Sequence, residues 1–316
     1  MTRVSVEVPA RLHLGMLDVS AENGRRFGGV GVSVQRPAVR LEAVASDGLS
    51  AEGADADRAL VFARRFRDAL GLPGGAHLRV LEAIPPHVGL GSGTKLALAV
   101  AAALTALDGR APDPREMARA TGRGVRSAVG LWTFALGGLV VEGGVGSAGG
   151  AAPLVARHPM PEEWRCVLVI PSAEPGMSGP AEEAAFRRLA PASAQAPLVA
   201  QTVLTSLLPA LVDDDLDEFG AALTRMQRLV GEAFRDVQGG CFHPLAGGLV
   251  DALLAHGAAG AGQSSWGPAV YGFVRGDQEG RMLAGHMEEE LAGRGQVELV
   301  GFDNNGARVE RRCDCS

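Results

Sequence analysis

Gly89-Leu90-Gly91-Ser92-Gly93-Thr94-Lys95 is the segment that decides how this chain is interpreted, because it leads directly into the apolar run of residues 96–107. Lys95 is the single lysine of the chain, and every other basic side chain is an arginine. The first turn of a helix exposes unpaired N–H groups at the positive end of the helix dipole, so a lysine there is unfavourable unless an anion lies between them. The segment therefore predicts a phosphate-binding loop; the alternative is that one lysine persisted by chance.

The loop does not match the two common phosphate-binding motifs. A Walker A loop requires Gly-Lys-Ser/Thr, whereas here Thr94 precedes Lys95 and Leu96 follows it. The third glycine of the dinucleotide-binding fingerprint is also missing. What remains is a loop of three glycines, whose backbone can approach an anion closely, with two hydroxyl groups at the start of a helix.

The composition excludes several classes of function. The net charge of −6 and the pI of about 5.7 provide no general attraction to nucleic acid, and aromatic residues, at 4%, are too few for base-stacking platforms. No apolar run reaches the ~20 residues that span a bilayer. The chain opens on an alternating pattern at residues 4–8 rather than on a signal peptide, and its four cysteines form no disulfide framework, so we expect a cytoplasmic protein.

Hydrophobic periodicity predicts an α+β protein with two lobes, because strands and helices occur in both halves without regular βαβ alternation. Pro9 to Gly29 is expected to be a long connection. Residues 143–150 are almost all small and are the best linker candidate, so the predicted lobes are 1–150 and 151–316. The closing Cys313-Asp314-Cys315 is expected to be a frayed tail, with a soft-metal site as the alternative. The expected strands are 3–8, 30–35, 38–44, 77–81, 137–141, 166–170, 258–262, 268–274 and 296–302, and the expected helices are 57–70, 94–107, 114–121, 180–190, 196–211, 215–230, 244–256 and 278–292.

Three glycine-bearing segments together resemble the GHMP kinase superfamily. The phosphate loop, with Pro85 four residues before Gly89, resembles that superfamily's Pro-x-x-x-Gly-Leu-Gly-Ser motif. Pro9-Ala10-Arg11-Leu12-His13-Leu14-Gly15 is similar to its N-terminal element, and Gly262-Gln263-Ser264-Ser265-Trp266-Gly267-Pro268 occupies the place of its C-terminal glycine motif. The resemblance implies a two-lobed GHMP-kinase-like fold, with an N-terminal lobe like domain 2 of ribosomal protein S5 and a ferredoxin-like C-terminal lobe.

Within that superfamily, the details resemble the β-ribofuranosylaminobenzene 5′-phosphate synthases. Residues 122–138 contain no acidic residue, whereas the kinases typically carry a catalytic base there. Arg126-Ser127 in that stretch, Arg25-Arg26-Phe27-Gly28-Gly29-Val30-Gly31, and Met177-Ser178-Gly179 with Glu182 and Glu183 are similar to the synthase pattern.

The resemblance implies a reaction between 5-phosphoribosyl 1-diphosphate (PRPP) and 4-aminobenzoate. A carbon–carbon bond forms at ribose C1, CO2 and diphosphate leave, and the product begins methanopterin biosynthesis. Whether the acceptor is 4-aminobenzoate or 4-hydroxybenzoate stays open, and a homodimer is expected. An ATP-dependent small-molecule kinase of the same fold is the alternative, and a non-catalytic binding protein is a third hypothesis.

The same resemblance implies roles for particular side chains. The diphosphate is expected on the phosphate loop, through Gly89, Gly91, Ser92, Gly93, Thr94 and Lys95. Arg25 with Arg26, or Arg123 with Arg126, would form a second anion clamp. A solvated face is an equal alternative for Arg25 and Arg26, and a weaker one for Arg126, which lies among apolar and small residues. Mg²⁺ would be held by Asp18 or Glu142. For each of these acids taken singly, a place on the surface without a metal is the more common alternative. Catalytic roles are expected for His13, Arg126 and Ser127, although such a histidine is more often structural, and the aromatic acid is expected on Gln263, Ser264, Ser265 and Trp266.

Overall fold

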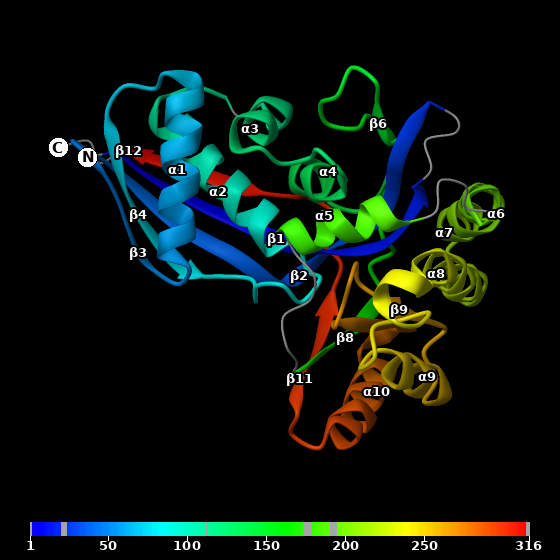
Figure 1. The fold of residues 1–316 in the computed structure, drawn as a ribbon. Coiled ribbons are helices and arrows are strands. Elements are labelled where there is room, and N and C mark those ends of the chain that lie inside the picture. The colour runs from blue at the N-terminus through cyan, green and yellow to red at the C-terminus, as the bar shows by residue number, and fades with distance from the viewer. Residues whose placement is uncertain (1, 20–23, 112, 173–178, 190–194, 314–316) are drawn as a thin grey trace.

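The computed structural model describes residues 2–19, 24–111, 113–172, 179–189 and 195–313, and it confirms the expected α+β architecture. Two lobes are each built on their own sheet (Figure 1). The described chain contains no helix that is both long enough and apolar enough to cross a bilayer.

The larger lobe contains an eight-stranded sheet. Its strands are β1 (Thr2–Asp18), β2 (Arg25–Ser46), β3 (Leu49–Gly53), β4 (Gly75–Glu82), β5 (Leu139–Glu142), β6 (Val145–Gly146), β7 (Leu154–His158) and β12 (Arg308–Cys313). The main path has the order β12-β1-β2-β4-β3, while β5 pairs with β2 and β7, and β6 pairs with β2. All these neighbours are antiparallel except β3 and β4.

Four helices cover one face of this sheet, with α2 packed directly on β1 and β2 (Figure 1). They are α1 (Ala56–Leu70), α2 (Ser92–Leu107), α3 (Pro114–Thr121) and α4 (Val129–Leu136).

The smaller lobe contains a four-stranded antiparallel sheet with helices around it. Its strands are β8 (Trp164–Pro171), β9 (Gly260–Gln263), β10 (Val270–Arg275) and β11 (Gly295–Gly301), in the order β11-β8-β10-β9. The helices of this half of the chain are α5 (Gly179–Arg188), α6 (Ala196–Thr202), the π-helical η1 (Val203–Leu207), α7 (Leu208–Val212), α8 (Leu216–Gln238), α9 (Gly247–Ala255) and α10 (Gly276–Leu291).

The expected connection from Pro9 to Gly29 is wrong, because two long strands occupy most of it. β1 continues to Asp18, and β2 already begins at Arg25. The pairing of β1 with β2 shifts register between Pro9 and Ala10, and such a bulge accommodates a proline inside a strand. Residues 30–35 and 38–44, expected as two strands, belong to β2.

The two sheets do not divide the chain at residue 150, the expected boundary. β7 follows the small residues of 143–150 but pairs with β5, in the larger sheet. β12, which was not expected, returns from the end of the chain to pair with β1, so the described ends lie side by side (Figure 1). A run of small residues indicates a loose connection, whereas strand pairing depends on partners that are distant in sequence.

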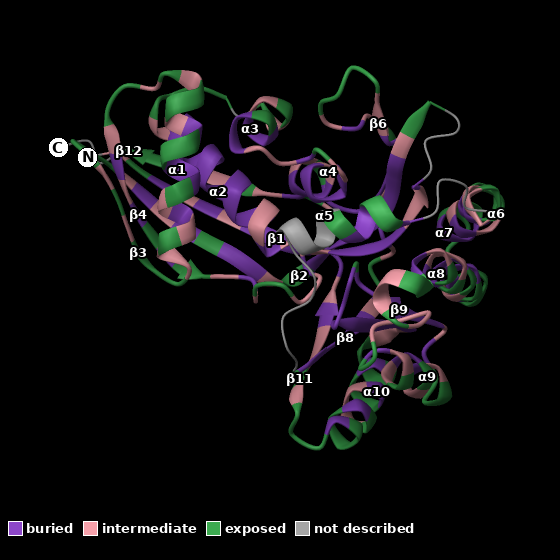
Figure 2. Cartoon of the chain, viewed as in Figure 1, coloured by how far each residue is buried: buried purple, intermediate pink, exposed green. Residues whose placement is uncertain are grey.

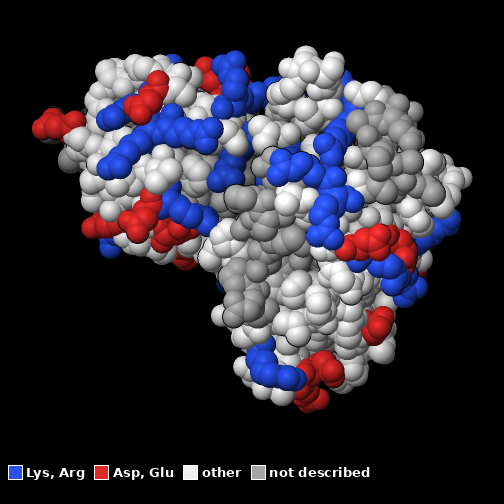
Figure 3. Space-filling view, viewed as in Figure 1, with Lys and Arg blue, Asp and Glu red and all other residues white. Residues whose placement is uncertain are grey.

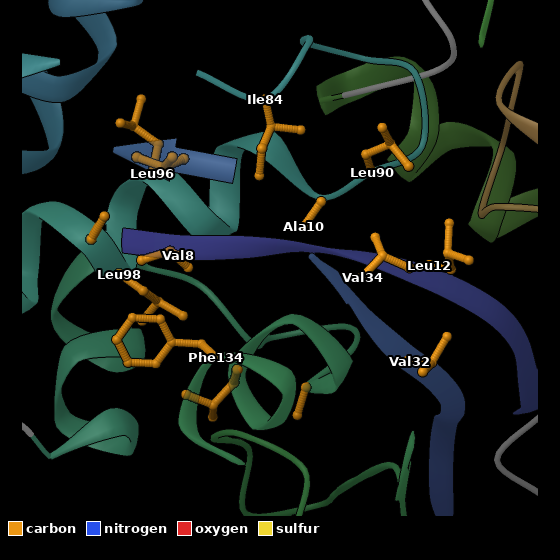
Figure 4. Packing of buried hydrophobic residues seen from close by; sticks show 14 of the residues in the cluster. Val8, Ala10, Leu12, Val32, Val34, Ile84, Leu90, Leu96, Leu98 and Phe134 are labelled. Carbon is orange, nitrogen blue, oxygen red and sulfur yellow. The ribbon is translucent and has the colours of Figure 1, made fainter. Parts of the chain in front are cut away.

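The core of the larger lobe forms between α2 and the sheet. Val8 of β1 lies beside Leu98 of α2, whereas Leu12 lies farther along the strand, beside Val34 of β2 (Figure 4). These side chains are all fully or almost fully buried. Residues 95–103 of α2 are all buried, which agrees with a helix that is apolar nearly all round. Buried residues follow α2 and the strands beneath it, whereas α1 exposes its outer face (Figure 2). The loop before α2 therefore leads directly into the core of the larger lobe.

The close contact of α8 with β9 generates a stability prediction. A Cβ on Gly220 would lie 2.2 Å from the Ala259 carbonyl oxygen, which belongs to backbone and cannot easily move. We expect Gly220→Ala to lower the free energy of unfolding by roughly 1–3 kcal/mol through overpacking, despite the better helix propensity of alanine. The control is Gly285→Ala in α10, where no atom lies within 4 Å of the new Cβ. Urea unfolding checks both variants, and equal stabilities would contradict the packing described for α8.

Candidate active site

Three segments that are far apart in the sequence meet at one point between the lobes. The backbone N–H of His13 donates to Ser264 Oγ at 3.0 Å, and this hydroxyl donates to the carbonyl of Gly89 at 2.7 Å. The N–H of Ser265 donates to the carbonyl of His13 at 3.1 Å. The phosphate loop, β1 and the loop after β9, which contain the three motifs of the sequence resemblance, are thus joined by hydrogen bonds.

Gly89 is required at this junction by both its conformation and its surroundings. Its φ is +93°, in the left-handed region, and a Cβ would lie 2.1 Å from the carbonyl oxygen of Ser264. The guanidinium of Arg11 donates to the carbonyl of Gly89 and lies against Gly91. Arg11 belongs to the N-terminal motif but was not among the predicted site residues.

His13, Ser127 and Glu142 form a buried polar cluster beside the junction. His13 Nε2 lies 3.2 Å from Ser127 Oγ, and the Ser127 hydroxyl hydrogen-bonds to the Glu142 carboxylate. Glu142 also accepts from the N–H groups of Ala128, at 3.2 Å, and Gly144, at 2.9 Å. Ser127 lies between the histidine and the acid, unlike a nucleophile triad, where the histidine lies between the other two. Two predicted catalytic residues are therefore in direct contact.

Burial sets the charge state of this cluster. The pKa of His13 is lowered to about 3, mainly by desolvation and further by the nearby charge of Arg11, so the imidazole is neutral at pH 7. Desolvation also raises the pKa of Glu142, and the backbone donors partly oppose it. A neutral imidazole can accept or donate a hydrogen bond to an uncharged substrate group.

An apolar pocket opens beside His13. It is partly open to solvent and is walled by Trp266 together with Phe186 and Phe234. The Trp266 ring meets these two rings edge to face, with centroids 5.4 and 5.0 Å apart. Polar groups at the walls are the side chains of Gln227, Gln238, Gln263 and Ser265. A pocket of aromatic walls with a few polar groups suits a small aromatic ligand.

The predicted aromatic-acid residues take different places at this pocket. Gln263, Ser265 and Trp266 line it, whereas the hydroxyl of Ser264 joins the three segments. The Arg126 guanidinium lies 5.6 Å from the Phe186 ring centroid, at the pocket wall. These residues come together as predicted in space, although their roles in binding stay predictions.

Arg25 and Arg26 are directed at backbone carbonyls. Arg25 donates to the carbonyl of Gly144 at 2.9 Å, and Arg26 donates to the carbonyls of Val19 and Phe186. In this arrangement both side chains stabilise the start of β2 and its contact with α5. The structure does not bring them to the phosphate loop.

The two predicted metal ligands are separated by β2. Asp18 pairs with Phe27 on one edge of β2, and Glu142 pairs with Gly29 on the other. The described residues contain no group of three histidine, cysteine, aspartate or glutamate side chains that could hold a metal. Both oxygens of Glu142 already accept backbone hydrogen bonds, so Asp18 and Glu142 do not form a shared site.

Lys95 is fully buried and points into the contact between α2 and α4. Its Nζ donates to Thr133 Oγ1 at 2.9 Å, and desolvation lowers its pKa to about 7. A phosphate contact would require this ammonium to leave that position, so its role on the diphosphate stays a prediction. Met177 and Ser178 of the synthase-like pattern lie outside the described residues, as do the side chains of Gly179, Glu182 and Glu183 and the tail from Asp314 onward.

Comparison with known proteins first defines the class. The GHMP kinases N terminal domain matches residues 57–138, and the GHMP kinases C terminal domain matches residues 207–291. Homoserine kinase from Cytophaga hutchinsonii has a TM-score of 0.67 at 18% identity, covering 98% of this chain and 97% of that one. Phosphomevalonate kinase from Streptococcus pneumoniae has a TM-score of 0.70 at 15% identity, covering 99% and 100%. Identities this low establish a shared GHMP fold and nothing about activity.

Relatives that align over most of both chains identify the family within this superfamily. β-Ribofuranosylphenol 5′-phosphate synthase of Methanothermobacter thermautotrophicus is 30% identical over 96% of this chain and 97% of its own. The synthase of Archaeoglobus fulgidus is 33% identical over 85% of this chain and 87% of its own. This chain belongs to the β-ribofuranosylphenol 5′-phosphate synthase family of the GHMP superfamily.

The burial of Lys95 predicts a pH-dependent stability. Its pKa is about 7 in the folded protein against 10.5 ordinarily, so between these pH values the unfolded state binds more protons and stability rises with pH. The slope contributed is at most about 1.4 kcal/mol per pH unit. Lys95→Met should remove this slope and raise the free energy of unfolding at pH 7 by roughly 1–3 kcal/mol.

Urea unfolding of both proteins at pH 7, 8 and 9 measures this effect. The prediction is contradicted if the free energy of unfolding of the variant rises with pH as steeply as that of the unaltered protein, or if the variant is less stable at pH 7. Either result would show that the surroundings of the ammonium compensate for its burial.

Proposed function

We propose that this protein transfers the 5-phosphoribosyl group of PRPP to the ring of a 4-substituted benzoate, releasing CO2 and diphosphate. The observation that carries the proposal is the aromatic-walled pocket, with neutral His13 at its edge, directly beside the phosphate loop. The names of the full-length relatives support the same reaction class. The product would enter methanopterin biosynthesis.

The reaction requires no nucleophilic side chain of the protein. The C1–O bond of PRPP breaks, and its electron pair leaves with the diphosphate oxygen. The ring carbon that bears the carboxylate bonds to C1, and the bond from that carbon to CO2 then breaks and returns its pair to the ring. No proton has to leave a carbon atom, so Ser127 need not be activated for attack. The site must instead hold two anions and an electron-rich ring in contact.

His13 suits the acceptor because it is neutral. A para hydroxyl or amine donates electrons to the ring as positive charge develops there, and a neutral imidazole can accept its hydrogen bond. Ser127 and Glu142 position the imidazole from the other side. A protonated histidine would oppose the positive charge of the ring.

The identity of the para group belongs to the proposal. The relatives are named for a ribofuranosylphenol, which favours a hydroxyl, whereas the sequence resemblance predicted 4-aminobenzoate. Both groups donate electrons to the ring, so either acceptor fits the mechanism. Mg²⁺ would be held chiefly by the oxygens of PRPP, since Mg²⁺ commonly binds through substrate phosphates.

A kinase is the less favoured function. The full-length relatives at 30% identity or more are named as synthases, whereas the solved kinases share the fold at 12–23% identity. Residues 122–138 contain no acid that could serve as the catalytic base of a kinase.

A direct assay tests the proposal. The protein is mixed with PRPP, Mg²⁺ and carboxyl-labelled 4-hydroxybenzoate or 4-aminobenzoate, and released CO2 and diphosphate are measured. We expect equal amounts of both products, and the larger kcat/KM identifies the acceptor. Parallel reactions replace PRPP with ATP and the benzoate with an alcohol. Release of ADP there, without CO2 from PRPP, would support the kinase, and no turnover in either reaction would contradict both functions.

The pocket predicts a selective effect of Trp266. Trp266→Leu removes an aromatic wall of the pocket, and a contact between that ring and the ring of the benzoate would be worth about 0.5–1.5 kcal/mol. We expect the KM for the benzoate to rise roughly 10-fold while the KM for PRPP stays unchanged. Trp132→Leu is the control, because Trp132 lies in α4 and does not line the pocket. A rise in the KM for PRPP alone would assign Trp266 to the other substrate.

A further inference from the structure

We propose that Arg58, Arg65 and Arg123 bind the diphosphate end of PRPP and retain inorganic diphosphate after transfer. The inference rests on the proposed function. The sequence analysis offered Arg123 as part of a second anion clamp, but α1 had no predicted part in the site. The three arginines come from two parts of the larger lobe, α1 and the loop between α3 and α4.

Arg123 lies at the start of α2, beside the two arginines of α1. Arg58, Phe62 and Arg65 follow one face of α1 at positions i, i+4 and i+7. The Arg123 guanidinium lies 4.8 Å from the Phe62 ring centroid, between the two arginines of α1. Its Nη2 lies 3.3 Å from the position that a Cβ on Gly93 would take, which places it at the first turn of α2.

This group of cations has little negative charge to balance it. Arg58 pairs with Asp55 at 2.9 Å, but among the described residues neither Arg65 nor Arg123 has a carboxylate within 4.0 Å. The Nε atoms of Arg58 and Arg123 are buried without a hydrogen-bond partner in the described structure. Like charges gathered in this way repel, and burial together with the neighbouring arginines lowers the pKa of Arg123. An anion would relieve both the repulsion and the missing hydrogen bonds.

The surrounding backbone adds to the attraction. The N–H groups of Ser92 and Gly93, in the first turn of α2, make no hydrogen bond in the described structure and lie at the positive end of the helix dipole, whereas that of Thr94 donates to the carbonyl of Gly91. Basic side chains lie over α1 and toward the centre of this face, with acidic side chains beside both ends of α1 (Figure 3). An anion approaching this region meets positive potential from several directions.

The shape of the cluster favours a diphosphate over a monophosphate. Seven helical residues separate Arg58 from Arg65 by a rise of about 10.5 Å along α1, and Arg123 lies between them. An elongated row of guanidinium groups matches the linked phosphoryl groups of a diphosphate, whereas a single phosphate needs a compact site. Guanidinium groups bind phosphate oxygens in pairs, which favours arginine over lysine here.

The position of the cluster agrees with the order of atoms in the substrate. At Gly89 the phosphate loop is hydrogen-bonded to Ser264, whose neighbours Gln263 and Ser265 line the pocket, and at Gly93 the loop lies against Arg123. A diphosphate lying along the loop from Gly93 toward Gly89 directs its ester bond to C1 at the pocket. The leaving group then lies on the arginines and the acceptor lies on the aromatic walls.

Isothermal titration with inorganic diphosphate and with ribose 5-phosphate tests the inference. The variant is Arg65→Gln, and the matched control is Arg64→Gln, since Arg64 is the adjacent exposed arginine on another face of α1. We expect the Kd for diphosphate to rise about 10- to 100-fold in Arg65→Gln, as for loss of a charge-assisted hydrogen bond, and to change less than twofold in Arg64→Gln. The Kd for ribose 5-phosphate should stay unchanged in both. Far-ultraviolet circular dichroism verifies that both variants are folded.

The possible outcomes separate this inference from the proposed function. If both variants weaken diphosphate binding equally, the arginines act only through the general positive potential of this surface, and the inference is overturned. If Arg65→Gln loses ribose 5-phosphate binding selectively, the cluster binds the 5′-phosphate instead, and the inference is overturned as well. Normal diphosphate binding by Arg65→Gln, in a protein that makes the ribosylated product, also overturns it and leaves the function intact. Arg65-dependent diphosphate binding without turnover of PRPP and benzoates would support the subsite and reject the function.

Discussion

The contact between Gly89 and Ser264 is the constraint on which the site depends. The carbonyl oxygen of Ser264 occupies the space of a Cβ on Gly89, and the Ser264 hydroxyl bonds the loop carbonyl while it accepts from the backbone of His13. Because these groups come from both lobes, the lobes meet at a defined distance. The acceptor pocket on one side of the loop and the arginine cluster on the other are positioned by the same few atoms.

Charged and uncharged side chains lie at different places around the phosphate loop. On the side of α1, three arginines gather and only Arg58 has a carboxylate partner among the described residues, which suits a leaving group of high negative charge. On the side of the second lobe, desolvation keeps His13 neutral beside aromatic walls, which suits an electron-rich ring. A GHMP fold that binds a nucleoside triphosphate in kinases can therefore serve a different transfer when the walls around the same loop change.

Much of the fold could be predicted because its signals are local. The apolar run after Gly93, the Asp-Pro start of α3 and the periodicity of α8 and α10 each indicate an element without knowledge of its partners. The connection predicted from Pro9 to Gly29 failed because glycine and polar residues also occur in long, bulged strands. β7 and β12 could not be assigned to the first sheet, since the pairing of distant strands leaves no local pattern.

The sequence by itself determined the family, the phosphate loop and the three motifs that meet, since glycines and small polar residues at these spacings serve close backbone contacts. The tertiary structure alone decided which side chains reach the site. It buried Lys95 against Thr133 and separated Asp18 from Glu142 by a strand. It also brought Arg123 to the start of α2, beside the arginines of α1. The spacing of residues along a chain indicates local motifs. The burial and the charge of a side chain at a site depend on its tertiary contacts with elements that are distant in the sequence.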